Sequence, residues 1–354
     1  MGKNFLITTG GSGGHVLPAK IIFEHLSKDK NVIISIDRRG LKYLEKDNYQ
    51  FEIIDTPKLN NIFILPVNLI KILFLTLKSI LLLKRKKIDQ ILSTGGYMSL
   101  PIILAARLLQ LNIYLLEPNQ VLGRANRYFL GSCKKIFCYS EKIKNFPDDS
   151  KDKIITINPL VAENIYKLKK SEKMKDEFTL LIVGGSQGAS IFDRSLKSTI
   201  VNISKKITIK IIQQTSQKNI NSLSDYYSKN NVENKIFSFD KDFTQFIQEA
   251  DLCITRAGAS TLAELSVMNT PFIAVPLPTS KDNHQMENAN FYKENNSCWI
   301  IEQINFEEKI EQFLIDVLNN KSDYLNKKEN LKKLNFQNTW INVNQKILRA
   351  INEN

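Results

Sequence analysis

The chain has 354 residues, of which 43% are hydrophobic and 24% are charged, a balance that excludes an intrinsically disordered chain. Its length favours two domains over one. Residues 1–160 hold 24 basic against 13 acidic side chains, whereas residues 161–354 hold 25 against 23, so the net charge of +13 is concentrated in the first half. A one-sided positive charge is typical of a protein that meets an anionic partner, a nucleic acid or a membrane surface, although it also serves solubility.

The four cysteines, Cys133, Cys138, Cys253 and Cys298, have neither the paired spacing of a zinc site nor the density of a disulfide-stapled domain. We expect them to be reduced thiols in a cytosolic compartment. The first residues, MGKNFLITTGG, enter a strand pattern directly, and we expect no export signal there.

Short runs rich in Ile, Val and Phe alternate with segments of helical period from residue 4 to residue 158. This alternation is typical of a parallel sheet with helical crossovers. We expect a helix at about 16–28 and strands at 4–9, 32–37, 51–55, 88–93, 113–116, 135–139 and 154–157. The pattern predicts an α/β, doubly wound first domain over residues 1–158.

Residues 159–178 are polar and rich in lysine, which predicts a linker between domains. A second series of strands then predicts a second doubly wound domain over residues 179–335. The strands expected there are 179–183, 207–213, 235–239, 251–255, 271–275 and 297–301. A final helix within 336–354 has the length to pack back onto the first domain.

Residues 62–83 are the most apolar stretch and are long enough for a transmembrane helix. Pro66 interrupts the stretch early, however, and its polar side chains fall within one arc of about 160° on a helix. These side chains are Asn68, Lys71, Thr76, Lys78 and Ser79. The opposite face is apolar and leads into a run of basic residues, which is typical of a helix lying in an anionic membrane interface. We favour that interpretation over a core helix, and the residues expected at the membrane are Leu69, Ile70, Leu73, Phe74, Leu77, Lys84, Arg85, Lys86 and Lys87.

Three glycine-rich loops follow predicted strands: TTGGSGGHVLPA at 8–19, STGGYMSLP at 93–101 and VGGSQGAS at 183–190. Glycines at a strand-to-helix junction let backbone amides approach a ligand, and a helix N-terminus favours phosphate. The three loops together predict a cleft that holds more than one phosphorylated group. The first loop departs from the dinucleotide fingerprint because Val16 stands where the third glycine belongs, although Asp37 is at a suitable distance for a ribose contact.

His15 lies at the mouth of the first loop, where ligands of such folds bind. An imidazole there can take a proton from a hydroxyl near neutral pH. We favour this role over a structural one for His15, and assign His25 to structure.

The segment 255–289, TRAGASTLAELSVMNTPFIAVPLPTSKDNHQMENA, contains a further helix start at 258–261 that can hold a diphosphate. Glu264 can accept two hydrogen bonds from the hydroxyls of a ribose. Equally, Thr261 as the N-cap would make Glu264 the carboxylate of a capping box. The spacing alone leaves these two interpretations even.

Taken in order, TGGSGGHVLPA, STGGY, LLEPNQVLGRANR, GGSQGAS, RAGASTLAEL and KDNHQMENA resemble the MurG family over nearly the whole chain. The resemblance implies a glycosyltransferase-B fold, with two Rossmann-like doubly wound domains facing a cleft. It implies inverting transfer of GlcNAc from UDP-GlcNAc to the MurNAc 4-hydroxyl of undecaprenyl-pyrophosphoryl-MurNAc-pentapeptide (lipid I), which forms lipid II in peptidoglycan synthesis. The reaction implied needs no cofactor and no catalytic metal, and the implied location is peripheral, at the cytoplasmic face of the bacterial cell membrane.

The resemblance also assigns site residues and partners. The implied contacts to UDP-GlcNAc are Ser12, Gly13, Gly14, Asn119, Ser186, Gln187, Arg256, Ala259, Ser260, Thr261, Glu264, Gln285 and Asn288. The implied contacts to the acceptor are Gly10, Gly11, Gly95, Gly96 and Tyr97, and His15 is the implied base. The implied partners are UDP-GlcNAc, lipid I, the anionic cytoplasmic membrane surface and other cell-wall synthesis proteins, with no nucleic acid.

Some positions depart from the family pattern. The segment INPLV places Val161 where the family often has an arginine that contacts the donor, and LLEPN replaces a common His-Glu-Gln-Asn. His284 stands at a usual glutamine, and Asp240 aligns roughly with a residue beside the uracil. These departures bear on donor affinity and leave the base and the phosphate loops in place.

Three alternatives remain open. The first is a related nucleotide-sugar transferase with another lipid acceptor, such as diacylglycerol. The second is a nicotinamide-dependent oxidoreductase, which the spacing of the first loop disfavours. The third is an inactive membrane-surface scaffold of the same fold, toward which only Val161 points. Nucleic-acid binding is disfavoured because the basic charges accompany an apolar helix rather than a surface for base stacking.

Overall fold

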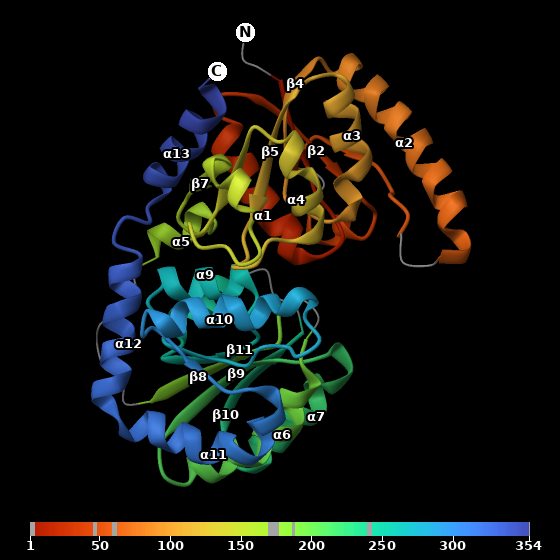
Figure 1. Cartoon of the computed structure of the whole chain (residues 1–354). Helices are drawn as coiled ribbons and strands as arrows, with labels where there is room; N and C mark the ends of the chain where they lie inside the picture. Colours follow the sequence, from red (N-terminus) through yellow and green to blue (C-terminus); the bar gives the residue numbers. More distant parts are fainter. Residues whose placement is uncertain are drawn as a thin grey trace. The chain divides into compact units, whose positions relative to one another are not determined.

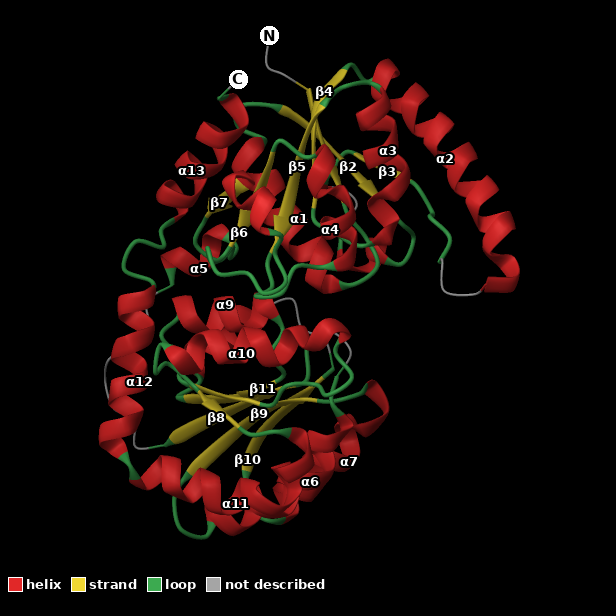
Figure 2. Ribbon diagram, in the orientation of Figure 1, coloured by secondary structure: helices red, strands yellow, loops and turns green. Residues whose placement is uncertain are grey.

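The computed structural model describes residues 4–44, 48–58, 62–168, 177–185, 188–238 and 243–353. The chain divides into two compact units, the first formed by Met1–Leu160 with Trp340–Asn354 and the second by Val161–Thr339. In each unit a parallel sheet carries helices on both faces (Figures 1 and 2). The two sheets with their helices confirm the predicted α/β class, and two such units in one chain agree with the glycosyltransferase-B fold that the family resemblance implies.

The sheet of the first unit has seven strands in the order β3-β2-β1-β4-β5-β6-β7. The strands are β1 Asn4–Thr8, β2 Asn31–Ile36, β3 Phe51–Ile53, β4 Ile88–Ser93, β5 Asn112–Glu117, β6 Lys135–Cys138 and β7 Ile154–Thr156. The strand order reverses at β1, where Thr8 pairs with Ser35 of β2 on one side and with Ser93 of β4 on the other. Ligands of open α/β sheets bind beyond the carboxyl ends of the strands at such a reversal.

Alternation along β1 explains why both faces of this sheet are covered. Phe5 and Ile7 are fully buried in one hydrophobic cluster, whereas Leu6 is fully buried in another. Successive side chains of a strand point to opposite faces, so a strand buried on both faces is a continuous apolar run. The helices of the unit are α1 Gly13–Leu26, α2 Leu65–Arg85, α3 Leu100–Leu108, α4 Arg124–Phe129 and α13 Trp340–Asn352.

The last helix, α13, completes the core of the first unit. Its Val343 and Ile347 are fully buried with Ile22 of α1 in the cluster that holds Phe5 and Ile7. The ring of His25 stacks on Trp340 at a centroid distance of 3.6 Å, and Asn344 Nδ2 donates to the His25 carbonyl oxygen at 2.9 Å. His25 is 1% exposed, so its role in packing agrees with its assignment to structure.

The sheet of the second unit has six strands in the order β10-β9-β8-β11-β12-β13. They are β8 Phe178–Val183, β9 Ile209–Gln214, β10 Glu233–Phe237, β11 Leu252–Thr255, β12 Phe272–Ala274 and β13 Trp299–Ile300. The helices are α5 Glu163–Lys167, α6 Ser190–Ser204, α7 Ile220–Lys229, α8 Phe243–Glu249, α9 Ala259–Val267, α10 His284–Glu294, α11 Gln303–Asn319 and α12 Lys321–Leu334. The strand order reverses at β8, which lies between β9 and β11.

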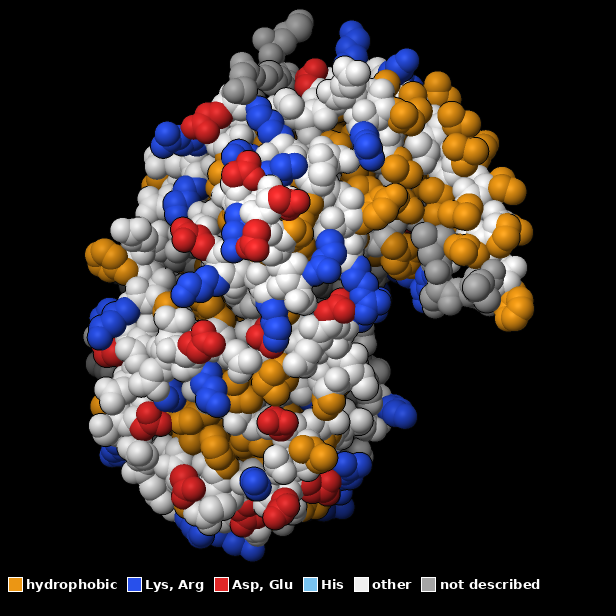
Figure 3. Space-filling view, viewed as in Figure 1, with side chains coloured by type: hydrophobic (Ala, Val, Ile, Leu, Met, Phe, Trp, Pro, Cys, Tyr) orange, Lys and Arg blue, Asp and Glu red, His pale blue; other side chains and the backbone are white. Residues whose placement is uncertain are grey.

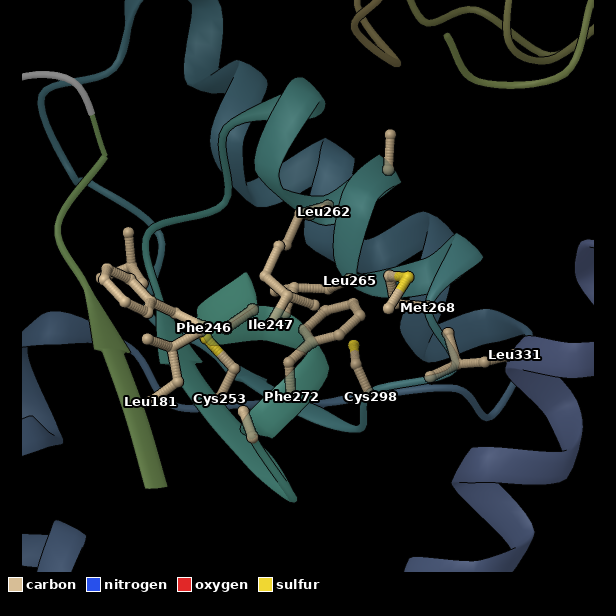
Figure 4. Close-up of a cluster of buried hydrophobic side chains, with 14 of the residues drawn as sticks. Leu181, Phe246, Ile247, Cys253, Leu262, Leu265, Met268, Phe272, Cys298 and Leu331 are labelled. Carbon is tan, nitrogen blue, oxygen red and sulfur yellow. The ribbon is translucent and has the colours of Figure 1, made fainter. Parts of the chain in front are cut away.

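One face of this second sheet packs on α8 and α9. Figure 4 shows Phe246 and Ile247 of α8 and Leu262 and Leu265 of α9 meeting Phe272 of the sheet. All five side chains are at most 1% exposed. This packing fixes α9 after β11, whose last residue, Thr255, pairs with Val183 at the end of β8.

Candidate functional site

The first glycine loop leaves β1 at the strand reversal of the first unit. Gly10 and Gly11 have φ values of 149° and 78°. A Cβ at Gly10 would clash with Asp37 Oδ1, and a Cβ at Gly11 would clash with the methyl group of Met98. Both positions therefore need glycine, because larger residues would be strained and would displace their neighbours.

Asp37, at the end of β2, holds this loop in place. Its side chain is 2% exposed, and its Oδ1 accepts the amides of Gly11 at 2.7 Å and Gly40 at 3.0 Å. Its Oδ2 accepts Arg39 Nε at 2.7 Å. The carboxylate is thus committed to the chain itself, which removes the ribose contact that would have favoured a nicotinamide-dependent oxidoreductase.

His15 lies in the first turn of α1, because the helix begins at Gly13, three residues earlier than expected. Its Nδ1 lies 2.8 Å from the carbonyl oxygen of Thr94. A carbonyl oxygen only accepts hydrogen bonds, so Nδ1 carries the proton and the neutral ring has its lone pair on Nε2. This tautomer is the one that a histidine needs in order to accept a proton at Nε2 as a general base.

The second glycine loop passes close to Nε2 of His15. Gly95 and Gly96 have φ values of 88° and 82°. A Cβ at Gly96 would lie 3.4 Å from His15 Nε2, so the absence of a side chain there leaves room beside the nitrogen. The loops are also joined directly, since Thr94 Oγ1 donates to Thr9 Oγ1 at 2.8 Å. The structure therefore brings together His15 and both loops predicted to hold the acceptor.

Glu117, the last residue of β5, is a buried carboxylate at the same edge of the sheet. It accepts the Gly123 amide at 2.7 Å, and the side-chain amides of Asn119 and Asn126 each at 3.0 Å. Burial raises the pKa of Glu117, and these hydrogen bonds oppose the rise. Glu117 is not among the predicted site residues, although an acidic residue at the end of an otherwise apolar strand marks such a position. Asn119, a predicted donor contact, is positioned by this carboxylate.

The third glycine loop, in the second unit, turns tightly after β8. A Cβ at Gly184 would clash with the backbone of Gly188 and Ala189, and Gly185 and Gly188 have φ values of 75° and 71°. Only glycine fits this turn at Gly184. The predicted donor contacts Ser186 and Gln187 lie outside the described residues, as does Asp240.

The start of α9 decides between the two interpretations of Thr261. The helix begins at Ala259 with Gly258 as its N-cap, and the cap makes no side-chain hydrogen bond. Thr261 is therefore the third residue of the helix, and the capping-box interpretation of Thr261 and Glu264 is wrong. The first turn, Ala259 to Thr261, is half-buried and keeps its backbone amides at the helix N-terminus, where phosphate binds well.

Glu264 lies in the second turn of α9. Burial raises the pKa of Glu264 to about 7. Among the described residues its carboxylate has no hydrogen-bond or ion-pair partner. Glu264 is half-buried, and a partly desolvated carboxyl group without a partner is suited to accept hydrogen bonds from the hydroxyls of a bound ligand.

Three other predicted donor contacts are hydrogen-bonded to the chain itself. Arg256 is 8% exposed and donates to the carbonyl oxygen of Val275 at 3.0 Å, and burial lowers its pKa. Gln285 Oε1 accepts the Leu277 amide at 3.0 Å, and Asn288 Nδ2 donates to the Ala257 carbonyl oxygen at 3.1 Å. These bonds hold the loops after β11 and β12, and direct donor contact by the three residues stays a prediction.

Val161 and His284 mark the departures from the family pattern. Val161 is 1% exposed within the hydrophobic cluster of the second unit, so an apolar side chain fits its surroundings. His284 is the first residue of α10, after Asp282 and Asn283, which adopt left-handed backbone conformations at φ 52° and 55°.

The surface of α2 differs from the expected one. Of the predicted polar arc, Asn68, Thr76 and Ser79 are buried, whereas Lys71 and Lys78 are exposed, so only part of the arc faces solvent. Figure 3 shows hydrophobic side chains gathered over α2. The exposed apolar residues include Leu69, Ile70, Leu73, Phe74 and Leu77, with exposed fractions between 53% and 69%.

The buried polar side chains of α2 are all satisfied. Thr76 Oγ1 and Ser79 Oγ donate to carbonyl oxygens one turn earlier, at 2.8 and 2.7 Å, and Asn68 Nδ2 donates to the Lys58 carbonyl oxygen at 2.8 Å. Small polar side chains bonded to their own helix let α2 pack on α3. Pro66 stands in the first turn of α2, where proline is favoured, so the part of the apolar stretch before Leu65 lies outside the helix.

By length and composition α2 could cross a membrane, and 28% of its most apolar window is buried against the first unit. The basic run after it is mostly exposed at Lys84, Arg85 and Lys87. Glu52 lies 3.4 Å from Arg85 and 3.5 Å from Lys86, and so offsets part of their charge. Among the described residues no group of three or more His, Cys, Asp or Glu side chains is placed to bind a metal ion.

Family models match both parts of the chain. The glycosyltransferase family 28 N-terminal domain matches residues 5–138, and the glycosyltransferase family 28 C-terminal domain matches residues 179–341. In the solved structures, a crystal structure of Acinetobacter baumannii MurG has a TM-score of 0.77 with this chain at 24% identity, covering 99% of this chain and 100% of the other.

Two curated relatives carry the same name, UDP-N-acetylglucosamine–N-acetylmuramyl-(pentapeptide) pyrophosphoryl-undecaprenol N-acetylglucosamine transferase. The protein from Pelagibacter ubique (strain HTCC1062) is 48% identical over 356 aligned residues, which cover 100% of both chains. The protein from Rickettsia massiliae (strain Mtu5) is 34% identical over 348 aligned residues, covering 90% of this chain and 92% of the relative. The chain therefore belongs to the MurG family of family 28 glycosyltransferases.

Proposed function

We propose that the chain transfers N-acetylglucosamine from UDP-GlcNAc to the MurNAc 4-hydroxyl of lipid I, which forms lipid II in peptidoglycan synthesis. The observation that carries this conclusion is the full-length identity of 48% with a relative named for that transfer. The site of the first unit agrees with it, because an imidazole with its lone pair on Nε2 lies between two loops suited to phosphate.

His15 is the general base of this reaction. As the acceptor oxygen attacks C1 of GlcNAc, Nε2 takes the hydroxyl proton, the new O–C1 bond forms and the bond from C1 to the UDP oxygen breaks. The attack from the opposite side inverts the anomeric centre. The hydrogen bond from Nδ1 to the Thr94 carbonyl oxygen holds the ring in the required tautomer and stabilises the imidazolium that forms.

The second unit holds the donor. The first turn of α9, Ala259 to Thr261, offers backbone amides to the diphosphate of UDP-GlcNAc, and Glu264 accepts the ribose hydroxyls. Gly188 and Ala189 lead into α6, which presents a second helix N-terminus in the same unit. Ser12, Gly13, Gly14, Asn119, Ser186, Gln187, Arg256, Gln285 and Asn288 remain predicted donor contacts.

The acceptor's diphosphate binds in the first unit, at Gly10 and Gly11 of the first loop and at Gly95, Gly96 and Tyr97 of the second. Support comes from the positive φ values at all four glycines, which turn the loops tightly beside α1 and its His15. Other cell-wall synthesis proteins are further partners suggested by the family resemblance alone.

In this proposal the protein attaches peripherally to the cytoplasmic face of the membrane through α2. The helix α2 packs on α3 and buries Ile72, Thr76 and Ser79, while it exposes large apolar side chains elsewhere on its surface. A helix with one face packed on protein and one apolar face exposed, next to a basic run, is suited to lie in the interface of an anionic bilayer.

Replacing Leu73 and Leu77 by glutamate is expected to release the protein from vesicles that contain anionic lipid, because two charges then face the hydrocarbon. Co-sedimentation with the vesicles measures the effect. Leu325→Glu is the matched control, since Leu325 is also exposed, at 56%, but belongs to α12 of the second unit. Equal binding of the double variant and the control to the vesicles would contradict membrane attachment through α2 and would favour a purely structural role for this helix.

Transfer of labelled GlcNAc from UDP-GlcNAc to a lipid I analogue tests the reaction itself, with and without EDTA. We expect transfer at the same rate in both, because the proposed chemistry uses a histidine base and backbone amides and no catalytic metal. Loss of transfer in EDTA that Mg²⁺ restores would contradict the metal-independent mechanism. Absence of transfer to lipid I, with transfer to another lipid such as diacylglycerol, would favour the related lipid glycosyltransferase.

A further inference from the structure

Arg39 is a cation that lies between the first and second glycine loops. Its Nε donates to Asp37 Oδ2 at 2.7 Å, and the other oxygen of Asp37 accepts the Gly11 amide at 2.7 Å. Its guanidinium carbon lies 5.1 Å from the centre of the Tyr97 ring. The side chain is thus in contact with both loops through Asp37 and Tyr97.

The backbone that carries Arg39 is fixed against the first loop. The next residue, Gly40, donates its amide to Asp37 Oδ1 at 3.0 Å and begins the short helix η1, Gly40–Tyr43. A Cβ at Gly40 would lie 3.0 Å from the Cα atom of Gly10, so the two backbones are in direct contact. Movement of Arg39 away from the loop would break these contacts.

The guanidinium stays charged and keeps donors available. Burial lowers the pKa of Arg39, but the hydrogen bond and the charge of Asp37 outweigh that effect and raise it. A guanidinium has five N–H donors, and Asp37 occupies only one side of it. The Arg39 side chain is 42% exposed although Asp37 is only 2% exposed, so part of the guanidinium remains open to a ligand.

We propose that Arg39 binds the diphosphate of the lipid-linked acceptor and supplies a full positive charge beside the partial charges of the loop amides. A planar guanidinium matches the oxygens of a diphosphate in two parallel hydrogen bonds. Asp37 anchors the guanidinium through a hydrogen bond, and the Tyr97 ring lies against it. This inference rests on the proposed function, because it concerns the acceptor of that reaction.

The test compares Arg39→Gln with Arg38→Gln in the full chain. Glutamine at position 39 retains a donor for Asp37 and removes the charge. Arg38 is the matched control, because its side chain is 79% exposed and pairs with Asp55 at 3.1 Å, so its loss changes the net charge equally. We expect Arg39→Gln to raise the KM for a lipid I analogue about tenfold or more and to leave the KM for UDP-GlcNAc unchanged. Arg38→Gln should change neither.

Inorganic pyrophosphate is the second probe. It should inhibit the wild-type enzyme in competition with the acceptor, and Arg39→Gln should weaken that inhibition by a similar factor. Arg39→Lys should recover part of both effects, since it restores the charge without the planar fork. Equal acceptor KM and equal pyrophosphate inhibition for Arg39→Gln and Arg38→Gln would overturn the inference while wild-type transfer stands. A wild-type enzyme that transfers nothing to lipid I would instead overturn the proposed function.

Discussion

Replacing His15 by asparagine is expected to lower kcat for transfer to lipid I by about a hundredfold or more, because the acceptor hydroxyl then loses its general base. Asparagine retains an amide donor that can reach the Thr94 carbonyl oxygen, now bonded to Nδ1 at 2.8 Å, and it lacks a nitrogen that accepts a proton. The loss should therefore fall on kcat, with little change in the melting temperature or in the KM for UDP-GlcNAc.

The pH profile gives the same assignment a second test. The wild-type rate should fall on the acidic side as Nε2 becomes protonated, and the residual rate of His15→Asn should lack that limb. Replacing His25 in the same way is the control, since His25 lies in the packing between α1 and α13. A rate unchanged in His15→Asn would assign the base to another group.

Replacing Glu264 by glutamine is expected to raise the KM for UDP-GlcNAc between about 10- and 100-fold, because a charged acceptor of two ribose hydrogen bonds is lost. The acceptor KM should not change. Ser260→Ala is a useful comparison, as Ser260 lies in the first turn of the same helix and carries no charge. Equal KM values for UDP-GlcNAc in the two variants would contradict the proposal that Glu264 binds the ribose hydroxyls.

The raised pKa of Glu264 adds a dependence on pH. Ribose hydroxyls donate to the carboxylate, so the donor binds preferentially to the ionised form. In the unliganded protein that form becomes dominant as the pH rises through about 7. Affinity for UDP measured by calorimetry should therefore increase from pH 6 to pH 8, and Glu264→Gln should flatten this increase. A profile that falls over this range would contradict the sign of the coupling.

The strands could be predicted from the sequence because parallel strands buried on both faces are continuous apolar runs. The expected strand 88–93 coincides with β4, Ile88–Ser93, and the three glycine loops follow β1, β4 and β8 as expected. The local sequence pattern is enough to locate these strands, because helices bury both faces of the sheet whichever way those helices are oriented.

The orientation of α2 could not be predicted in the same way. The hydrophobic pattern located a two-sided helix, but it did not reveal that Thr76 and Ser79 satisfy their hydroxyls within the helix and pack inward. Small side chains allow close approach of α3, whereas the larger Leu73 and Phe74 point outward. The cost of burying a hydroxyl disappears when it is hydrogen-bonded to its own backbone, which reverses the usual expectation.

Contacts between distant residues account for what the sequence did not reveal of the site. Asp37 reaches Gly11 because β1 and β2 are adjacent and end together, and Arg39 acquires its place from that pairing. Likewise the capping-box question depended on which residue begins α9, and patterns place helix ends poorly. The sequence reveals which residue types are present, whereas the distances between them depend on how the strands pair in the sheet.

The place of α13 in the first unit has a consequence for biosynthesis. A ribosome makes β1 well before α13, so the side of the first sheet that carries Phe5 and Ile7 lacks its final covering helix until residue 352 has emerged. The second unit, Val161–Thr339, is contiguous and can finish folding earlier. The nascent chain thus keeps part of this apolar face uncovered throughout most of its synthesis, a state in which chaperones can bind it.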